Sequence, residues 1–350
     1  MIKTKYLVMV TAVGACSHGT PSPAVKAAPP VAAATTSSVA LPGAPPDGVF
    51  LDYLAYDPVS HRVWVPAGGT GKVDVIDATT RALTPIDGFP VKEMERRGQK
   101  RTVGPSSATV GDGVVYIGNR GDSSICAFDR TSLAKQGCVT LDAMPDGLAY
   151  VASTKEVWVT TPRDKSIRTL DVSTPGKPAL KASIAFEGEP EGFAVDNVRG
   201  VFFTNLEDKD KTLVVDLKTH AIAHTWSSGC GEDGPKGLVF EDATDHLVVV
   251  CADKVETLDV AHDGAVIGTL AVGDGLDAID YVPARHQLFA TAGRAEKMVV
   301  ARLGPDGSLT AVATIPTAKG ARNAVASEDG TAFVAVGPSG SILVIPPTAL

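Results

Sequence analysis

Residues 147–171 read GLAYVASTKEVWVTTPRDKSIRTLD and contain three short runs of apolar character that turn-forming residues separate. The middle run, EVWVTT, consists mostly of β-branched and aromatic residues, and the third run ends at Asp171. Such runs between clusters of Gly, Pro, Asp and Ser are typical of β-strands. A weaker fourth run, KASIAF, begins at Lys181. The segment therefore predicts a small antiparallel sheet with one strand for each run.

The same unit recurs along the chain. Equivalent segments begin at Tyr53, Ser107, Gly147, Gly192, Gly237, Ala278 and Asn323. Their second residues follow one another at intervals of 54, 40, 45, 45, 41 and 45 residues. Short strands in groups of four, repeating every ~40–45 residues, are the signature of β-propeller blades. The sequence thus predicts an all-β fold, a seven-bladed β-propeller of four-stranded antiparallel blades, with an open sandwich of similar strands as the alternative.

The last unit is incomplete. It ends with SILVIPPTAL (341–350), which leaves no residues for an outermost strand of its own. The segment SSVALP, from Ser37 to Pro42, lies just before the first unit and is predicted to supply that strand. A ring closed by an N-terminal strand leaves no sheet edge exposed between its first and last blades.

Three of the units resemble a known bacterial family. The segments VYIGN…SSICAFD, VWVTT…SIRTLD and VFFTN…KTLVVD are similar to the repeats of YVTN, or YncE-like, β-propellers. The resemblance covers most of the chain and implies an exported or surface protein. Because propellers carry many unrelated functions, it implies no particular activity.

Two segments precede the propeller, which is predicted over residues 37–350. Residues 1–16 read as a lipoprotein signal peptide, with Lys3 and Lys5 before an apolar run and a lipobox-like Val-Gly-Ala-Cys ending at Cys16. Cys16 is therefore predicted to be lipidated, with a plain signal peptide cut nearby as the alternative. Ser17 resembles the residue found in lipoproteins sorted to the outer membrane, so we expect an outer-membrane-anchored lipoprotein, periplasmic or on the cell surface. Residues 17–36, rich in Pro, Ala, Ser and Thr, are predicted to be a disordered linker.

Blade topology predicts where a ligand would bind. The links that enter each first strand and the loops after each second strand should gather at one end of the central channel. The polar residues at these places form a predicted ligand-binding rim of mixed charge: Asp52, Asn119, Arg120, Asp146, Arg163, Glu191, Asn205, Lys236, Asp277, Arg294, Arg322 and Asn323.

Part of this rim could hold a metal. The set Asp146, Glu191, Asp277 and Asn323 offers the oxygen ligands that a divalent cation such as Ca²⁺ prefers. The motifs PDG, PEG and RNAVASEDG resemble pieces of metal-binding gluconolactonase-type propellers, which implies a metal that polarises a lactone carbonyl. That family has six blades and a different order of these residues. The alternative is that Pro-Asp-Gly and Pro-Glu-Gly are turn chemistry before an inner strand.

The long first interval contains an insertion. Residues 88–106, GFPVKEMERRGQKRTVGPS, carry five lysines and arginines. They predict either a basic lid or docking loop over the channel, suited to an anionic ligand, or a solvated surface turn.

Four cysteines lie within the propeller, and an even number in an oxidising compartment favours disulfides. Cys126 and Cys138 flank one turn of the second unit, and Cys230 and Cys251 fall at one rim of the fifth. Both pairs are predicted to form disulfides, with buried free thiols as the alternative. No His is close in sequence to activate any of the four for catalysis.

The remaining evidence favours binding over catalysis. A net charge of −8 repels polyanions, so we expect no nucleic-acid partner. No GxSxG, HExxH, phosphate-loop or CxxC motif occurs. The sequence thus predicts a non-catalytic envelope lipoprotein, a monomer anchored to the membrane, whose rim binds a partner protein or small ligand. The main alternative is a metal-dependent, lactonase-like hydrolase at the channel mouth; a cofactor-dependent dehydrogenase is less favoured, because Trp64, Trp158 and Trp226 fall in repeat strands.

Overall fold

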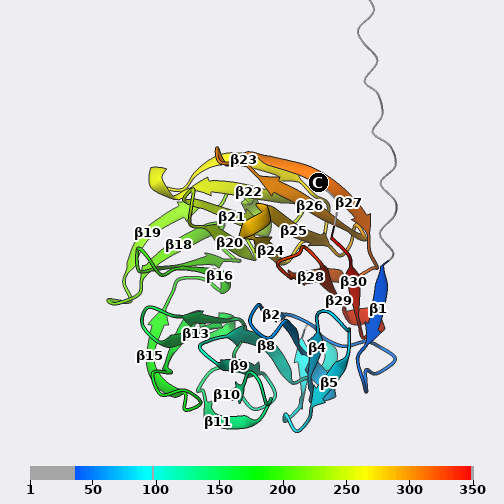
Figure 1. The fold of residues 1–350 in the computed structure, drawn as a ribbon. Helices are drawn as coiled ribbons and strands as arrows, with labels where there is room; N and C mark the ends of the chain where they lie inside the picture. Colours follow the sequence, from blue (N-terminus) through cyan, green and yellow to red (C-terminus); the bar gives the residue numbers. More distant parts are fainter. Residues whose placement is uncertain (1–35, 97, 348–350) are drawn as a thin grey trace, which may run out of the picture. The chain divides into compact units, whose positions relative to one another are not determined.

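The computed structural model describes residues 36–96 and 98–347 and shows seven four-stranded antiparallel sheets arranged in a ring (Figure 1). In six of these sheets the strands follow chain order, so short turns join neighbouring strands. The predicted seven-bladed β-propeller is confirmed. Cys16, its signal peptide and all but the last residue of the predicted linker lie outside the described residues. Within the described part, no helix combines the length and the apolar character needed to cross a membrane.

The strands of the first three blades are as follows. Blade one contains β2 (Ala55–Asp57), β3 (Arg62–Pro66), β4 (Val73–Asp77) and β5 (Leu83–Ile86). Blade two contains β8 (Pro105–Val110), β9 (Val114–Asn119), β10 (Ser124–Asp129) and β11 (Lys135–Thr140). Blade three contains β12 (Leu148–Val151), β13 (Glu156–Thr161), β14 (Ser166–Asp171) and β15 (Ala179–Ala185).

The other four blades repeat this plan. Blade four contains β16 (Pro190–Asp196), β17 (Val201–Leu206), β18 (Lys211–Asp216) and β19 (Ile222–Ser227). Blade five contains β20 (Leu238–Glu241), β21 (His246–Val250), β22 (Lys254–Asp259) and β23 (Ala265–Ala271). Blade six contains β24 (Ile279–Val282), β25 (Gln287–Ala292), β26 (Lys297–Leu303) and β27 (Leu309–Pro316). Blade seven contains β28 (Ala321–Ala326), β29 (Ala332–Val336), β30 (Ser341–Ile345) and, from the other end of the chain, β1 (Ser37–Ala40).

Strand β1 closes the ring as predicted. It pairs antiparallel with β30, in a register that sets Ser37 opposite Val344 and Ala40 opposite Ser341. In Figure 1 the blue β1 lies beside the red β30. Because the outermost strand of the last blade precedes the first blade in sequence, separation of the first and last blades requires this strand pairing to break.

The hydrophobic core lies between the blades. Each of the seven apolar clusters within the described residues joins two successive blades, and one of them joins blade seven to blade one. At the interface of blades three and four, the ring of Trp158 stacks on that of Phe202 with centroids 4.6 Å apart. Both faces of a blade are therefore buried, which explains why strands such as β9 and β13 are buried at every position instead of alternating.

The recurrent aspartate at the end of the third strand is a turn former. Oδ1 of Asp77 accepts hydrogen bonds from the backbone N–H groups of Thr79 and Thr80, at 3.0 and 2.7 Å. Asp216 makes the equivalent pair at 3.0 and 2.7 Å. These bonds hold the turn into the fourth strand and lower the pKa of both carboxyl groups. This part of the repeat is thus local turn chemistry.

Both predicted disulfides are present. Cys126 of β10 and Cys138 of β11 are directly opposite in the strand register and are bonded. Cys230 and Cys251 are bonded within blade five and tie the link before β20 to the loop after β21. Each disulfide therefore stabilises one blade.

The insertion of the first interval forms a hairpin of its own outside the seven blades. β6 (Lys92–Arg96) pairs antiparallel with β7 (Gln99–Val103). Asn119 holds the base of this hairpin, because its side-chain amide donates to the carbonyl oxygen of Pro90 at 3.0 Å. The insertion is therefore a defined two-stranded element, which we refer to as the hairpin, and its role as a lid or docking loop stays a prediction.

Candidate functional site

The hairpin stands beside a cavity of about 860 Å³ at one end of the channel. The links before the first strands and the loops after the second strands line this cavity, together with β7 of the hairpin. We refer to this end as the hairpin mouth. Its lining includes eight of the twelve predicted rim residues: Asp52, Arg120, Asp146, Glu191, Lys236, Asp277, Arg294 and Arg322.

A chain of ion pairs runs along the wall of the hairpin mouth. The Arg120 guanidinium pairs with the carboxylates of Asp146 and Asp52, the latter at 2.8 Å. Arg322 pairs with Asp52 at 3.7 Å and with Asp277 at 3.2 Å. Because these residues come from blades one, two, three, six and seven, the pairs connect five blades. Arg120 and Asp52 are almost fully buried, so removal of one partner would leave an uncompensated buried charge.

Phe50 supports three arginines on the same wall. Its ring centroid lies 4.7 Å from the guanidinium carbon of Arg101, 4.9 Å from that of Arg120 and 5.4 Å from that of Arg322. Arg101 comes from β7, so the hairpin delivers one cation to the blade wall. The negative face of an aromatic ring attracts cations, and Phe50 therefore helps to hold these three positive charges together.

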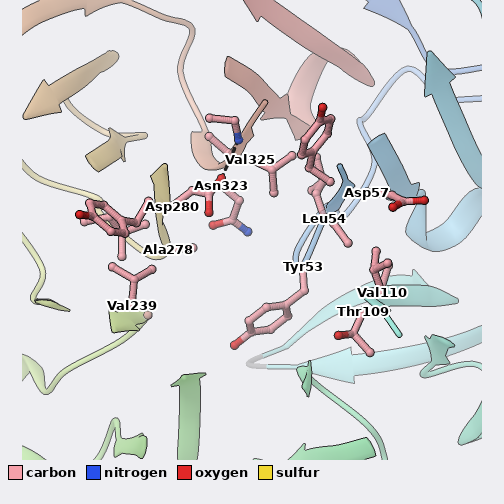
Figure 2. Close-up of a pocket in the computed structure, with 18 of the residues that line it drawn as sticks. Tyr53, Leu54, Asp57, Thr109, Val110, Val239, Ala278, Asp280, Asn323 and Val325 are labelled. Atoms are coloured by element: carbon pink, nitrogen blue, oxygen red, sulfur yellow. Dashed lines mark hydrogen bonds between the residues drawn. The ribbon is translucent and has the colours of Figure 1, made fainter. Parts of the chain in front are cut away.

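Tyr53 crosses the channel below this wall. Its hydroxyl group, carried by blade one, donates a 2.5 Å hydrogen bond to Oε1 of Glu191 in blade four. Its ring stacks on that of Phe193 with centroids 5.7 Å apart. Figure 2 shows the Tyr53 ring, just before β2, projecting into the space between the blades. The side chain thus separates the hairpin mouth from the rest of the channel.

The surroundings of Glu191 favour its neutral form. Burial and the nearby carboxylates of Asp52, Asp277 and Glu207 raise the pKa of Glu191 to about 8, and the hydrogen bond from Tyr53 opposes this shift. Burial and the nearby carboxyl groups of Glu191, Asp52 and Asp277 raise the pKa of Tyr53. Glu191 is therefore largely protonated at neutral pH, which reduces the negative charge of the mouth.

Of the four other rim residues, three asparagines donate hydrogen bonds to backbone carbonyl groups, and Arg163 lines another cavity. The side-chain amides of Asn205 and Asn323 donate to the carbonyl oxygens of Lys236 and Asp52, at 2.5 and 2.9 Å. Like Asn119, both therefore hold the backbone of a neighbouring link in place. Arg163 is exposed and lines a smaller cavity of about 60 Å³ that also contacts Arg101 and Glu191. Ligand contact by any rim residue stays a prediction.

The predicted metal ligands do not gather. In residues 36–96 and 98–347, no group of three or more His, Cys, Asp or Glu side chains is arranged to hold a metal ion. Asp146 and Asp277 face arginines, and Glu191 faces Tyr53. This arrangement gives the Ca²⁺ site of Asp146, Glu191, Asp277 and Asn323 no support, and the site stays a prediction.

Sequence reasoning missed Phe50 and Tyr53 as parts of this site. A signal for Tyr53 exists, because the equivalent first residue of the other six units is Ser, Gly, Ala or Asn. These small residues leave room for the ring: a Cβ atom on Gly147 would lie 3.1 Å from Cζ of Tyr53. Phe50 lies before the first repeat and follows no pattern.

The opposite end of the channel has a different lining. A cavity of about 670 Å³ lies between the first strands and opens at the turns that follow them, and we refer to it as the turn mouth (Figure 2). Its wall is mostly apolar, with Leu54, Val110, Phe193 and Val325 among the lining residues. Its charged lining residues are four acids and one base: Asp52, Asp57, Asp280, Glu328 and Arg130. Asp52 lines both cavities, and Tyr53, which lines the turn mouth, donates its hydrogen bond to Glu191 of the hairpin mouth.

Comparisons with known proteins agree with the fold. No family model and no curated protein sequence matches the chain. A chain of a mitotic checkpoint complex is similar over 97% of this chain and 99% of its own length, with 13% identity and a TM-score of 0.74. A chain of hydrazine synthase from Kuenenia stuttgartiensis is similar over 86% and 96%, with 14% identity and a TM-score of 0.68. The WD40 repeats of RRP9 are similar over 89% and 99%, with 11% identity and a TM-score of 0.65. At these identities the likeness concerns the β-propeller fold alone.

Proposed function

We propose that this protein is a non-catalytic binding protein that takes an anionic small ligand, or an acidic segment of a partner protein, at the hairpin mouth. The observation that carries this proposal is the charge of the cavity. Seven basic and five acidic side chains line it, although the whole chain has a net charge of −8. A local excess of positive charge on an acidic protein favours anions at that place.

The arrangement of these charges suits binding. Arg120 and Arg322 are held in ion pairs and against Phe50, so their positions are set before a ligand arrives. Lys100 and Lys319 are exposed at the same cavity. A pre-organised site loses less side-chain entropy on binding than a flexible one. We infer that the inner arginines shape the site and that the outer lysines attract the ligand.

Calorimetric titration of the full chain with citrate and with inorganic phosphate at low salt tests this proposal. We expect binding that weakens as the salt concentration rises and that falls about tenfold in the Lys100→Ala, Lys319→Ala double variant. Lys177→Ala is the matched control, because Lys177 is also exposed but does not line this cavity or the turn mouth. Equal affinity in the double variant and the control, or no binding of either anion, would contradict the proposal.

The cellular setting is also a proposal. The resemblance of the repeats to YVTN, or YncE-like, propellers and the lipobox-like segment support an outer-membrane lipoprotein held by lipidated Cys16, on the periplasmic or cell-surface side. Such a propeller would present the hairpin mouth, as a monomer, to an envelope protein or a small molecule and not to nucleic acid. Labelling of cells with a radioactive fatty acid tests the anchor: the wild-type protein should incorporate label and enter the membrane fraction, and Cys16→Ser should do neither.

A further inference from the structure

The turn mouth is separate from the site proposed above. It lies on the other side of Tyr53, and its volume of about 670 Å³ falls within the range of roughly 300–1,000 Å³ common for small-molecule sites. Its charged lining is mainly acidic, whereas that of the hairpin mouth is mainly basic. A ligand of this cavity would therefore differ in charge from one that binds at the hairpin mouth.

Asp280 departs from the repeat that builds this cavity. It is the third residue of the sixth unit, and the equivalent residues of the other units are Ala55, Thr109, Ala149, Ala194, Val239 and Val325. Of these seven positions only Asp280 is charged. Figure 2 shows Asp280 between Val239 and Val325, which come from the neighbouring strands β20 and β28. A carboxylate thus replaces an aliphatic group in an apolar wall.

The other acids of the turn mouth already have partners. Asp57 accepts from the Ser60 hydroxyl group and lies 3.6 Å from Arg130. Glu328 accepts a 2.8 Å hydrogen bond from the Tyr56 hydroxyl group. Asp52 belongs to the ion-pair chain of the other mouth.

Asp280 has only backbone support. Oδ2 of Asp280 accepts a 2.6 Å hydrogen bond from the N–H of Ala326. Among the residues that the structure describes, no Lys, Arg or His forms an ion pair with it. Burial raises its pKa to about 6, so it still carries a negative charge for most of the time at pH 7. The cavity therefore offers one carboxylate whose cation partner would have to come from outside.

We propose that the turn mouth binds a small organic ammonium ion, with the ammonium group at Asp280 and an apolar body against the wall formed by Val239, Phe193 and Val325. An ammonium group supplies the charge-assisted hydrogen bond that Asp280 lacks. The rings of Tyr56 and Tyr281, which also line the cavity, offer faces that attract cations. The remaining wall is apolar and suits an alkyl or aryl group.

Three probes of one shape and different charge test this assignment: 3-phenylpropylammonium, 3-phenylpropan-1-ol and 3-phenylpropionate, each titrated into the full chain at pH 7.5 and followed by NMR. We expect the ammonium ion to bind at least about tenfold tighter than the alcohol, and the carboxylate to bind most weakly. Asp280→Asn should reduce the ammonium affinity to that of the alcohol. Asparagine can still accept from Ala326, so the fold should persist, and thermal unfolding of the variant verifies this.

Two further variants sharpen the test. Asp242→Asn removes the same charge from an exposed position outside the cavity, and it should leave all three affinities unchanged. Val239→Phe fills part of the cavity and should weaken the binding of both the ammonium ion and the alcohol. The assignment is wrong if none of the probes binds, if the ammonium ion binds no tighter than the alcohol, or if Asp280→Asn retains the ammonium affinity of the wild-type protein.

Discussion

The two mouths of the channel are made from the two ends of the same first strands, yet they handle charge in opposite ways. At the hairpin mouth, carboxylates and guanidinium groups from five blades compensate one another, and basic residues remain in excess. At the turn mouth the wall is apolar, and Asp280 stands in it without an ion-pair partner among the described side chains. The difference teaches that the buried charges of the hairpin mouth connect blades, whereas the carboxylate of Asp280 is held by a backbone hydrogen bond alone.

The first prediction tests whether the ion pairs of the hairpin mouth connect the blades. Arg120→Ala leaves Asp52 and Asp146 buried without their shared cation, and we expect the free energy of unfolding to fall by about 3–5 kcal/mol. Urea denaturation measures this change. Arg294→Ala is the matched control, because Arg294 lines the same cavity with 73% of its side chain exposed. Its pair with Asp274 should contribute less than about 1 kcal/mol. Similar losses in the two variants would show that the buried pairs do not hold the blades together.

The second prediction uses pH at the same mouth. Because the pKa of Glu191 is raised from 4.5 to about 8, the folded protein keeps a proton that the unfolded chain loses between these values. The contribution of Glu191 to the free energy of unfolding therefore falls as pH rises through this window. Glu191→Gln removes this dependence, so its free energy of unfolding at pH 8.5 should exceed that of the wild type by at least about 2 kcal/mol.

Urea denaturation between pH 4.5 and 8.5 checks this expectation. Glu187→Gln is the control, because the pKa of Glu187 is lowered by its pair with Lys211 and its titration falls below the window. Parallel curves for wild type and Glu191→Gln would mean that Glu191 titrates normally.

The third prediction concerns the residue that divides the two mouths. Tyr53→Phe keeps the ring in the channel but removes the donor to Glu191, so we expect a loss of about 1–2 kcal/mol in the free energy of unfolding. The pKa of Glu191 should also rise further, because the Tyr53 hydrogen bond lowers it. NMR titration of labelled glutamate measures the pKa. The control Tyr150→Phe alters a hydroxyl group beside exposed Lys155 and should change stability by less than about 0.5 kcal/mol.

The fourth prediction concerns Asp280 at the turn mouth, where we expect a substitution to increase stability. The pKa of Asp280 is raised from 3.8 to about 6, so its ionisation destabilises the fold as pH rises through this range. The free energy of unfolding of Asp280→Asn should therefore exceed that of the wild type by at least about 1 kcal/mol at pH 7. Asp52→Asn, the same change at the hairpin mouth, should be less stable than the wild type because Arg120 and Arg322 lose their shared partner. Thermal unfolding of both variants at pH 7 measures the two changes in stability. A change of the same sign in both variants would contradict the difference between the two mouths.

Much of the architecture could be read from local patterns. The number of blades follows from the recurrence of segments such as GLAYV and GLVFE, and the incomplete last unit pointed to Ser37–Pro42 as the closing strand. The two disulfides could be predicted because the cysteines of each pair belong to one unit, where strand geometry limits the distance between them. Even the recurrent Asp at the third strand has a local explanation in its turn.

The candidate site could be predicted only in part. Repeat positions indicated which charged residues would reach the channel, and eight of the twelve line one cavity. Their pairing could not be predicted, because Arg120 could have met any of several carboxylates at similar positions. The hairpin also escaped prediction, since its charge-rich strands carry no apolar alternation and form outside the repeat.

The sequence alone therefore determined the number of blades, their order and the closure of the ring, because strand pairing within a unit is local and recurs at a regular interval. Only the tertiary structure decided which charges neutralise one another, which arginines share Phe50, and that Tyr53 reaches Glu191 across the channel. The physical reason is that these contacts join blades far apart in sequence. Their energies depend on distance and burial, which a repeat pattern does not record.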